Sequence, residues 1–349
     1  MILFTPGPCM TSHSVRQAAA WPDMNHHDPE YLEIVRETKS RLLGIHRGAR
    51  DWVPYLLGGS GTAAVEAMVA SCIDAGPVLV VENGYYSARI RDILEVHGIP
   101  YEVFRLGWME PWTSDAIDRL DQKMGEGYEA LLATHNETTL GRLNPVDEIG
   151  RRCRKHGVRC LVDAMSSFGA DDLAFGNIDA VASSANKCLH GIPGLSFVLL
   201  EPSFAEEVRR YRRRSYYLSL PMYEGDAPPL TPPVPALRAF LQALHEHPGQ
   251  TVRQEQYGAK MEAVRAGLGR LGLDFAVKAA ESSCTLCCPT LPAGWTVERW
   301  LKANRVQGFV LYTCKGNLRD RYFQVSAMGE TTPGQFDRWL EVVRGLLDL

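Results

Sequence analysis

The lysine at position 187 is the residue whose surroundings best suit covalent chemistry. It follows a short apolar strand expected over residues 179–183, and a turn rich in glycine and proline follows it at 191–194. A lysine amine held partly out of water has a lowered pKa and a free lone pair. Such an amine can form a Schiff base with an aldehyde cofactor. Taken alone, this segment also fits a lysine in a surface loop.

Asp163 ends a second apolar strand, expected over residues 158–162. A carboxylate at a buried strand end is costly unless it meets a cation or several donors. Pyridoxal 5'-phosphate (PLP) needs a lysine for its aldehyde and a carboxylate for its ring nitrogen, which the carboxylate keeps protonated. Asp163 alone fits a turn cap better than a cofactor contact. The pair nevertheless predicts PLP as the cofactor and Lys187 as the catalytic general acid–base.

A glycine-rich turn at residues 58–62 lies between an apolar strand and a helix. Its backbone N–H groups and the hydroxyls of Ser60 and Thr62 suit a single phosphate, because a helix N-terminus attracts anions. The turn lacks the lysine of a nucleotide-binding P-loop. Simple turn chemistry is the alternative explanation for these glycines.

Two polar segments follow two other strands. Tyr85 and Tyr86 come after the strand at 78–81, and either ring could stack on a cofactor ring or pack in the core. Residues 135–139 follow the strand at 130–134, and a hydroxyl there could bond the cofactor's phenolic oxygen or cap a helix.

Apolar strands alternate with helical segments over the first two thirds of the chain. This pattern predicts an α/β fold with a mostly parallel sheet and helices on both faces. Ligands in such folds bind beyond the carboxyl ends of the strands, where the residues above all lie. We expect a large domain over residues 1–245 and a smaller α+β domain over 246–349.

The composition excludes several classes of protein. The chain has 349 residues, a formal charge of -4 and no apolar run long enough to span a bilayer, so we expect neither nucleic acid nor membrane as partner. The N-terminal residues do not resemble a signal peptide, and the nine cysteines fit reduced thiols in a cytoplasmic protein. The spacing of Cys284, Cys287 and Cys288 favours a core strand over a metal site, and we expect no metal. The basic run at 209–214 fits a solvated helix face or, less well, an attraction for an anionic substrate.

Several motifs, in this order, resemble those of class V aminotransferases of fold type I. They are TPGP at 5–8, GSGT at 59–62, NGYY at 83–86, THNETT at 134–139, VDAMSSFG at 162–169 and SSANKC at 183–188. The last two most resemble the branch of 2-aminoethylphosphonate–pyruvate transaminases. The resemblance covers residues 2–240 well and the last third poorly.

This resemblance implies the fold of type I PLP-dependent transferases, with a mostly parallel sheet of seven strands in the large domain. It also implies a homodimer whose active sites lie at the subunit interface. Lys187 would bond the cofactor aldehyde, and Thr231 would reach the phosphate of the partner subunit. Asp163 would contact the ring nitrogen, Tyr86 the ring face and Thr138 the phenolic oxygen. The phosphate would be held by Ser60, Gly61, Thr62 and Asn186. Met165 would also contact the cofactor.

One position departs from the family pattern. The family has an arginine near the C-terminus that grips the acid group of the substrate, and here the aligned residue is Gln324. Glutamine offers no cationic fork. Either Arg319 or Arg321 replaces this arginine, or the acid group is held elsewhere, or the substrate differs.

The expected function is transfer of the amino group of a small anionic amine, 2-aminoethylphosphonate, to a 2-oxo acid such as pyruvate. The alternatives are a PLP-dependent lyase and an alanine- or serine-type aminotransferase that uses glyoxylate or pyruvate. A non-catalytic binding protein of the same fold disagrees with the presence of both Asp163 and Lys187.

Overall fold

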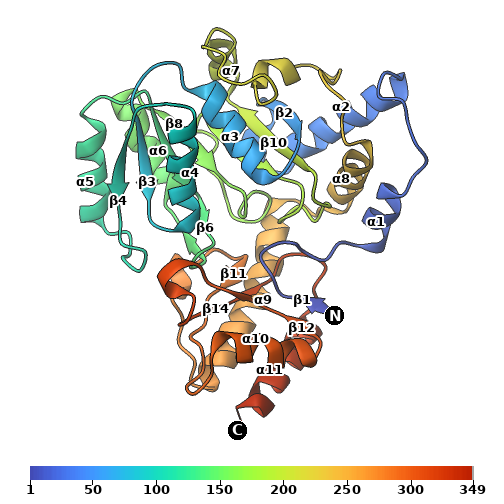
Figure 1. Ribbon diagram of the computed structural model, residues 1–349, viewed down its shortest axis with the longest axis vertical. Helices are drawn as coiled ribbons and strands as arrows, with labels where there is room; N and C mark the ends of the chain where they lie inside the picture. Colours follow the sequence, from blue (N-terminus) through green and yellow to red (C-terminus); the bar gives the residue numbers. More distant parts are fainter. Residues whose placement is uncertain (348–349) are drawn as a thin grey trace.

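The computed structural model describes residues 1–347, which form two lobes. The upper lobe in Figure 1 is built on a sheet of seven strands. Every neighbouring pair is parallel except the two that β10 makes. In spatial order the strands are β2 (Val53–Gly58), β10 (Leu195–Leu200), β9 (Ala180–Ser184), β8 (Arg159–Asp163), β5 (Ala130–Thr134), β3 (Val78–Glu82) and β4 (Tyr101–Arg105).

Alternate residues of each central strand enter two different cores. In β3, Leu79 and Val81 pack on one face of the sheet, whereas Val78 and Val80 pack on the other. Both faces are therefore covered, which explains why the strands are apolar throughout. The first face is covered by α2 (Pro29–Gly44), α5 (Ser114–Met124), α6 (Val146–His156) and α8 (Val234–Glu246), and the second by α3 (Gly61–Cys72), α4 (Tyr85–Val96) and α7 (Pro202–Val208).

The lower lobe holds its own core around the long helix α9 (Gln250–Arg270). The N-terminal strand β1 (Ile2–Leu3) pairs with β12 (Phe309–Val310), so the first residues of the chain lie in this lobe. The other elements here are β11 (Leu286–Cys287), α10 (Val297–Val306), β13 (Tyr312–Thr313), β14 (Phe323–Ser326) and α11 (Pro333–Leu346). The division into domains at residues 245 and 246 stays a prediction.

The remaining elements connect these parts. They are α1 (His13–Ala19), which packs on α8, and the short hairpin of β6 (Asn136–Glu137) and β7 (Arg142–Leu143). The hairpin follows β5 directly, so it extends from the edge of the sheet where the strands end.

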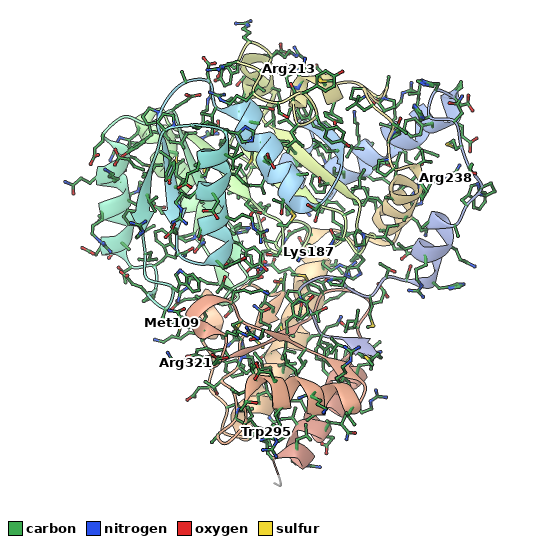
Figure 2. The ribbon with its side chains drawn as sticks, viewed as in Figure 1. Met109, Lys187, Arg213, Arg238, Trp295 and Arg321 are labelled. Carbon is green, nitrogen blue, oxygen red and sulfur yellow. The ribbon has the colours of Figure 1, made fainter. Side chains whose placement is uncertain are left out.

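The predicted α/β class with a mostly parallel seven-stranded sheet is confirmed. The prediction of a helix face at 209–214 is wrong, because α7 ends at Val208 and an irregular segment follows. Arginine side chains of this segment donate hydrogen bonds to backbone carbonyls; for example, Arg213 Nε donates to the carbonyl of Ser215 at 3.2 Å. Figure 2 shows Arg213 at the end of the upper lobe far from Lys187, which leaves no role for it beside that lysine.

Within residues 1–347, no helix has both the length and the apolar character needed to cross a membrane. In the same residues, no three His, Cys, Asp or Glu side chains gather in a way that could hold a metal ion. Cys287 lies in β11 and is buried, as the core-strand interpretation predicts. The nine cysteines form no disulfide.

Candidate active site

A cavity of about 480 Å³ opens beyond the carboxyl ends of the sheet strands and is lined by residues of the upper lobe. Figure 2 shows Lys187 at the junction of the two lobes. Since β8 and β9 are parallel neighbours, the residues that follow them reach the same place. The cavity brings together nine of the predicted residues: Ser60, Gly61, Thr62, Tyr86, Thr138, Asp163, Met165, Asn186 and Lys187.

The amine of Lys187 is held by the N-terminal segment. Lys187 Nζ donates a hydrogen bond to the carbonyl oxygen of Pro6 at 2.5 Å. Gly7 has φ +136°, and a Cβ there would overlap Lys187 Nζ, so only glycine fits at this crossing. Burial lowers the pKa of the Lys187 amine, and the nearby Arg89 guanidinium lowers it further. A lowered pKa frees the lone pair that a nucleophilic or basic amine needs.

Asp163 is a buried carboxylate without a cation partner in the described part of the chain. It is 7% exposed, and its Oδ1 accepts a hydrogen bond from the backbone N–H of Met165 at 2.9 Å. Burial raises the pKa of Asp163 to about 6. Because an uncompensated buried carboxylate is unfavourable, this geometry calls for a cationic group of a ligand.

The start of α3 offers donors to an anion. Ser60 is the N-cap residue, but its side chain makes no capping hydrogen bond. Gly61 packs so closely on Met165 that a Cβ would overlap the Met165 sulfur. The N–H groups of Gly61 and Thr62 and the hydroxyls of Ser60 and Thr62 therefore remain available to a phosphate at the positive end of the helix.

Three buried polar atoms in the cavity wall have no hydrogen-bond partner. They are Thr134 Oγ1, Asn136 Oδ1 and Ser184 Oγ. Buried polar atoms are normally paired, so these three indicate that a polar ligand completes the site. No role was predicted for these three residues, although each lies at or just after the carboxyl end of a strand.

This set of donors fits PLP. The cavity offers an amine for the aldehyde, a carboxylate for the ring nitrogen, the aromatic ring of Tyr86, and a glycine-rich helix N-terminus for the phosphate. Burial raises the pKa of the Tyr86 hydroxyl, so this phenol stays neutral at physiological pH.

Arg89 lines the cavity and was not predicted. It lies on α4, three residues after Tyr86 and hence on the same helix face. Its Nη1 donates to Thr62 Oγ1 at 3.2 Å, and its guanidinium carbon lies 5.1 Å from the centre of the Tyr86 ring. Among residues 1–347 it is the one arginine in the cavity wall, and it forms no ion pair with a carboxylate there. Helical spacing from Tyr86 was the signal that could have found it.

Four predicted residues lie outside the cavity wall. Thr231 is exposed in an irregular loop and lines a separate cavity of about 50 Å³ next to Gly58. Gln324 in β14 is 3% exposed, and its Nε2 donates to the carbonyl oxygen of Thr138 at 2.5 Å.

Arg319 and Arg321 are both exposed on the lower lobe. Arg319 lies 3.6 Å from Glu298, and the guanidinium of Arg321 lies 5.5 Å from the centre of the Tyr322 ring. Figure 2 shows Arg321 at the side of the lobe, away from Lys187. Neither arginine therefore takes the place of the family arginine within this chain.

Comparison with known proteins identifies the family. The model of the family "Aminotransferase class-V" matches residues 57–222. A 2-aminoethylphosphonate–pyruvate transaminase of Salmonella paratyphi A is 30% identical over 98% of this chain and 96% of its own length. One of Klebsiella pneumoniae subsp. pneumoniae is 32% identical over 94% of this chain and 93% of its own length. The chain belongs to the class V aminotransferase family.

Solved structures share the fold of the whole chain. An alanine–glyoxylate aminotransferase of Nostoc sp. has a TM-score of 0.91 at 23% identity, covering 99% of this chain and 95% of its own. A pyridoxamine–pyruvate aminotransferase of Mesorhizobium loti has a TM-score of 0.92 at 22% identity, covering 100% and 92%. The protein therefore has the α/β architecture of fold type I aminotransferases.

Proposed function

We propose that this protein is a PLP-dependent aminotransferase that moves the amino group of 2-aminoethylphosphonate to a 2-oxo acid such as pyruvate. The observation that carries this proposal is the pair of Lys187 and Asp163 in one buried cavity, each lacking an ion-pair partner among the described residues. The names of the two relatives described above, which match over nearly their whole lengths, support the choice of substrates.

When bound, PLP supplies the aldehyde that takes up the amino group and the ring that accepts electrons from the substrate carbon. In the proposal, Asp163 would hold the proton on the ring nitrogen, and Tyr86 would pack on the ring face. Thr138 would contact the phenolic oxygen. Ser60, Gly61, Thr62 and Asn186 would hold the phosphate.

Lys187 is the proposed general base and acid. Because burial lowers its pKa, Lys187 Nζ can be neutral and take a proton from the carbon that carries the substrate amine. The carbonyl of Pro6 orients this amine in the structure. The N-terminal segment that covers Lys187 also keeps water from the reacting atoms.

A homodimer with active sites at the subunit interface is part of the proposal. Thr231 lies outside the Lys187 cavity of its own chain and is exposed, as a residue that contacts a partner would be. Tyr216 and Tyr217 of the preceding segment are 69% and 44% exposed. A cytoplasmic location is also proposed, on the grounds that all nine cysteines remain thiols.

The identity of the substrate can be tested by absorbance. PLP-loaded protein is mixed with 2-aminoethylphosphonate in the absence of any oxo acid. We expect the visible cofactor band to be lost as the amino group is taken up, and pyruvate to restore it. A band that 2-aminoethylphosphonate leaves unchanged would contradict the proposed donor.

One observation favours the alternative substrates. In the described residues, no arginine of the lower lobe lines the cavity, and the amide of Gln324 is engaged by Thr138. The same absorbance experiment with alanine or serine as the amino donor tests the alternative, an alanine- or serine-type aminotransferase. Release of ammonia without any oxo acid would instead indicate a lyase.

Arg89 is proposed to add positive charge at the phosphate end of the cavity. Replacement of Arg89 by glutamine is expected to raise the dissociation constant for PLP by about 10- to 100-fold, since a hydrogen bond to a charged group contributes about 1.5–3 kcal/mol. Titration of cofactor-free protein with PLP measures this constant.

Arg91 provides a matched control. It lies two residues further along α4 and pairs with Glu82 at 2.9 Å outside the cavity. Arg91→Gln should leave the affinity for PLP as in the wild type. Equal PLP affinities of Arg89→Gln and Arg91→Gln would remove Arg89 from the phosphate site.

A further inference from the structure

A second cavity, of about 570 Å³, lies in the lower lobe between α9, the segment 329–332 and the start of α11. It shares no lining residue with the Lys187 cavity. Nothing in the proposed amino transfer uses it. Its wall nevertheless contains two cationic side chains, Arg253 and Lys260.

Arg253 is a buried arginine without a carboxylate partner among residues 1–347. It is 7% exposed, and its Nε has no hydrogen-bond partner. Its Nη1 reaches only the ring of His190, with 3.4 Å between Nη1 and Nε2. A buried guanidinium is normally paired with an anion, because removing the charge from water is unfavourable. Arg253 lines the cavity, and no carboxylate lies within ion-pair distance of its guanidinium in residues 1–347.

Lys260 lies two helical turns beyond Arg253 and so on the same face of α9. Its Nζ donates to Thr331 Oγ1 at 3.2 Å, and no carboxylate lies within ion-pair distance in the described residues. Both cationic groups lie 5.5 Å from the centre of the Tyr257 ring. The Tyr257 ring itself is fully buried and does not line the cavity.

Three carboxylates also line the cavity. Glu330 Oε1 faces His190 Nδ1 at 3.1 Å, and Glu246 accepts a hydrogen bond from Gln242 at 2.8 Å. Asp337 is exposed on α11. Glu330 and Glu246 therefore each have a partner other than the two cations. The carboxylates of the wall repel an extended polyanion, whereas a cavity of this size can admit a small acid group.

We propose that this cavity is a second binding site for a small oxyanion, held between Arg253 and Lys260. The ligand class is a phosphate, phosphonate or carboxylate group, because these accept hydrogen bonds from guanidinium and ammonium groups. The hydroxyl of Thr331, already in contact with Lys260, supplies a further polar contact.

The test is a calorimetric titration of the PLP-loaded protein with inorganic phosphate. Loading with PLP fills the phosphate site at the start of α3, so that site does not compete. We expect phosphate to bind, and Lys260→Gln to weaken binding by about 10-fold or more. Lys278→Gln is the control, since Lys278 is exposed in the same lobe and lies outside the cavity.

Two results would overturn the proposal. One is the absence of phosphate binding to the wild type up to tens of millimolar. The other is binding that Lys260→Gln leaves within twofold of the wild type, since phosphate would then lie elsewhere, such as in the Lys187 cavity. Lys260 is only half-buried, so its replacement preserves the fold better than a change at Arg253. A thermal unfolding curve of each variant checks this directly.

The same titration with methylphosphonate and with acetate distinguishes the sources of the acid group. Tighter binding of methylphosphonate assigns the site to phosphate-like dianions, and tighter binding of acetate assigns it to carboxylates. Either assignment requires that the preferred ligand lose affinity in Lys260→Gln.

Discussion

Replacement of Lys187 by alanine is expected to lower kcat by about 10⁴-fold or more, because both the covalent attachment point and the general base disappear. The amine has no substitute in the cavity. Among residues 1–347, the other cation in the wall is Arg89, which cannot lose its proton at physiological pH. The amino transfer from 2-aminoethylphosphonate to pyruvate measures the effect.

The fold should tolerate this replacement. Lys187 Nζ contacts the protein through the carbonyl of Pro6, and the alanine variant should still bind PLP through the residues of the glycine-rich turn. Lys187→Arg, which keeps the positive charge, should be as inactive as Lys187→Ala. Turnover within tenfold of the wild type in either variant would exclude Lys187 as the catalytic amine.

Replacement of Asp163 by asparagine is expected to lower kcat by about 10²- to 10³-fold while PLP remains bound. The carboxylate is proposed to stabilise the protonated ring nitrogen in a water-poor cavity, and loss of one such electrostatic contact has effects of this size. Asparagine has nearly the same shape, so packing against Met165 is preserved. Activity equal to the wild type would show that Asp163 only caps its turn.

In the absence of PLP, the folding stability of the wild type should depend on pH through Asp163, and Asp163→Asn should lack this dependence. The pKa of Asp163 rises from an ordinary 3.8 to about 6 in the folded protein. The unfolded chain therefore loses this proton first, and the folded state becomes less stable as pH rises from about 4 to about 6. The full cost, about 3 kcal/mol, is present above pH 6.

Urea unfolding of the cofactor-free wild type and of Asp163→Asn across this range measures the difference. We expect the stability of the variant relative to the wild type to increase by up to about 3 kcal/mol between pH 4 and pH 7. Added PLP should reduce this pH dependence in the wild type, because a cation beside Asp163 favours its ionised form. A difference that does not vary with pH would contradict the raised pKa.

Most of the upper lobe could be predicted from the sequence because its strands are apolar and separated by polar turns. The strand at 130–134 is found at the predicted residues, as β5. The direction of β10 could not be predicted, since an apolar run reads the same in either direction. The pairing of β1 with β12 was also inaccessible, because it joins segments about three hundred residues apart.

Some residues of the candidate site could likewise be predicted from the sequence, and others could not. Lys187 and Asp163 could be predicted together because each follows a strand, and parallel neighbours end at one edge. Arg89 lies at helical spacing from Tyr86, but whether its side chain reaches the cavity depends on how α4 packs against α3, which the sequence does not show. The position of Gln324 also depends on packing: the lower lobe turns its amide toward the carbonyl of Thr138, which no local pattern indicates.

The N-terminal segment links the lower lobe to the amine of Lys187. Its first residues are a strand of the lower lobe, and Pro6, three residues after that strand, holds the amine of Lys187. A rotation of the lower lobe would carry the Pro6 carbonyl with it and thus alter the restraint on the amine. The restraint on the lysine would thus depend on the position of the lower lobe, without any change in the loop that carries Lys187.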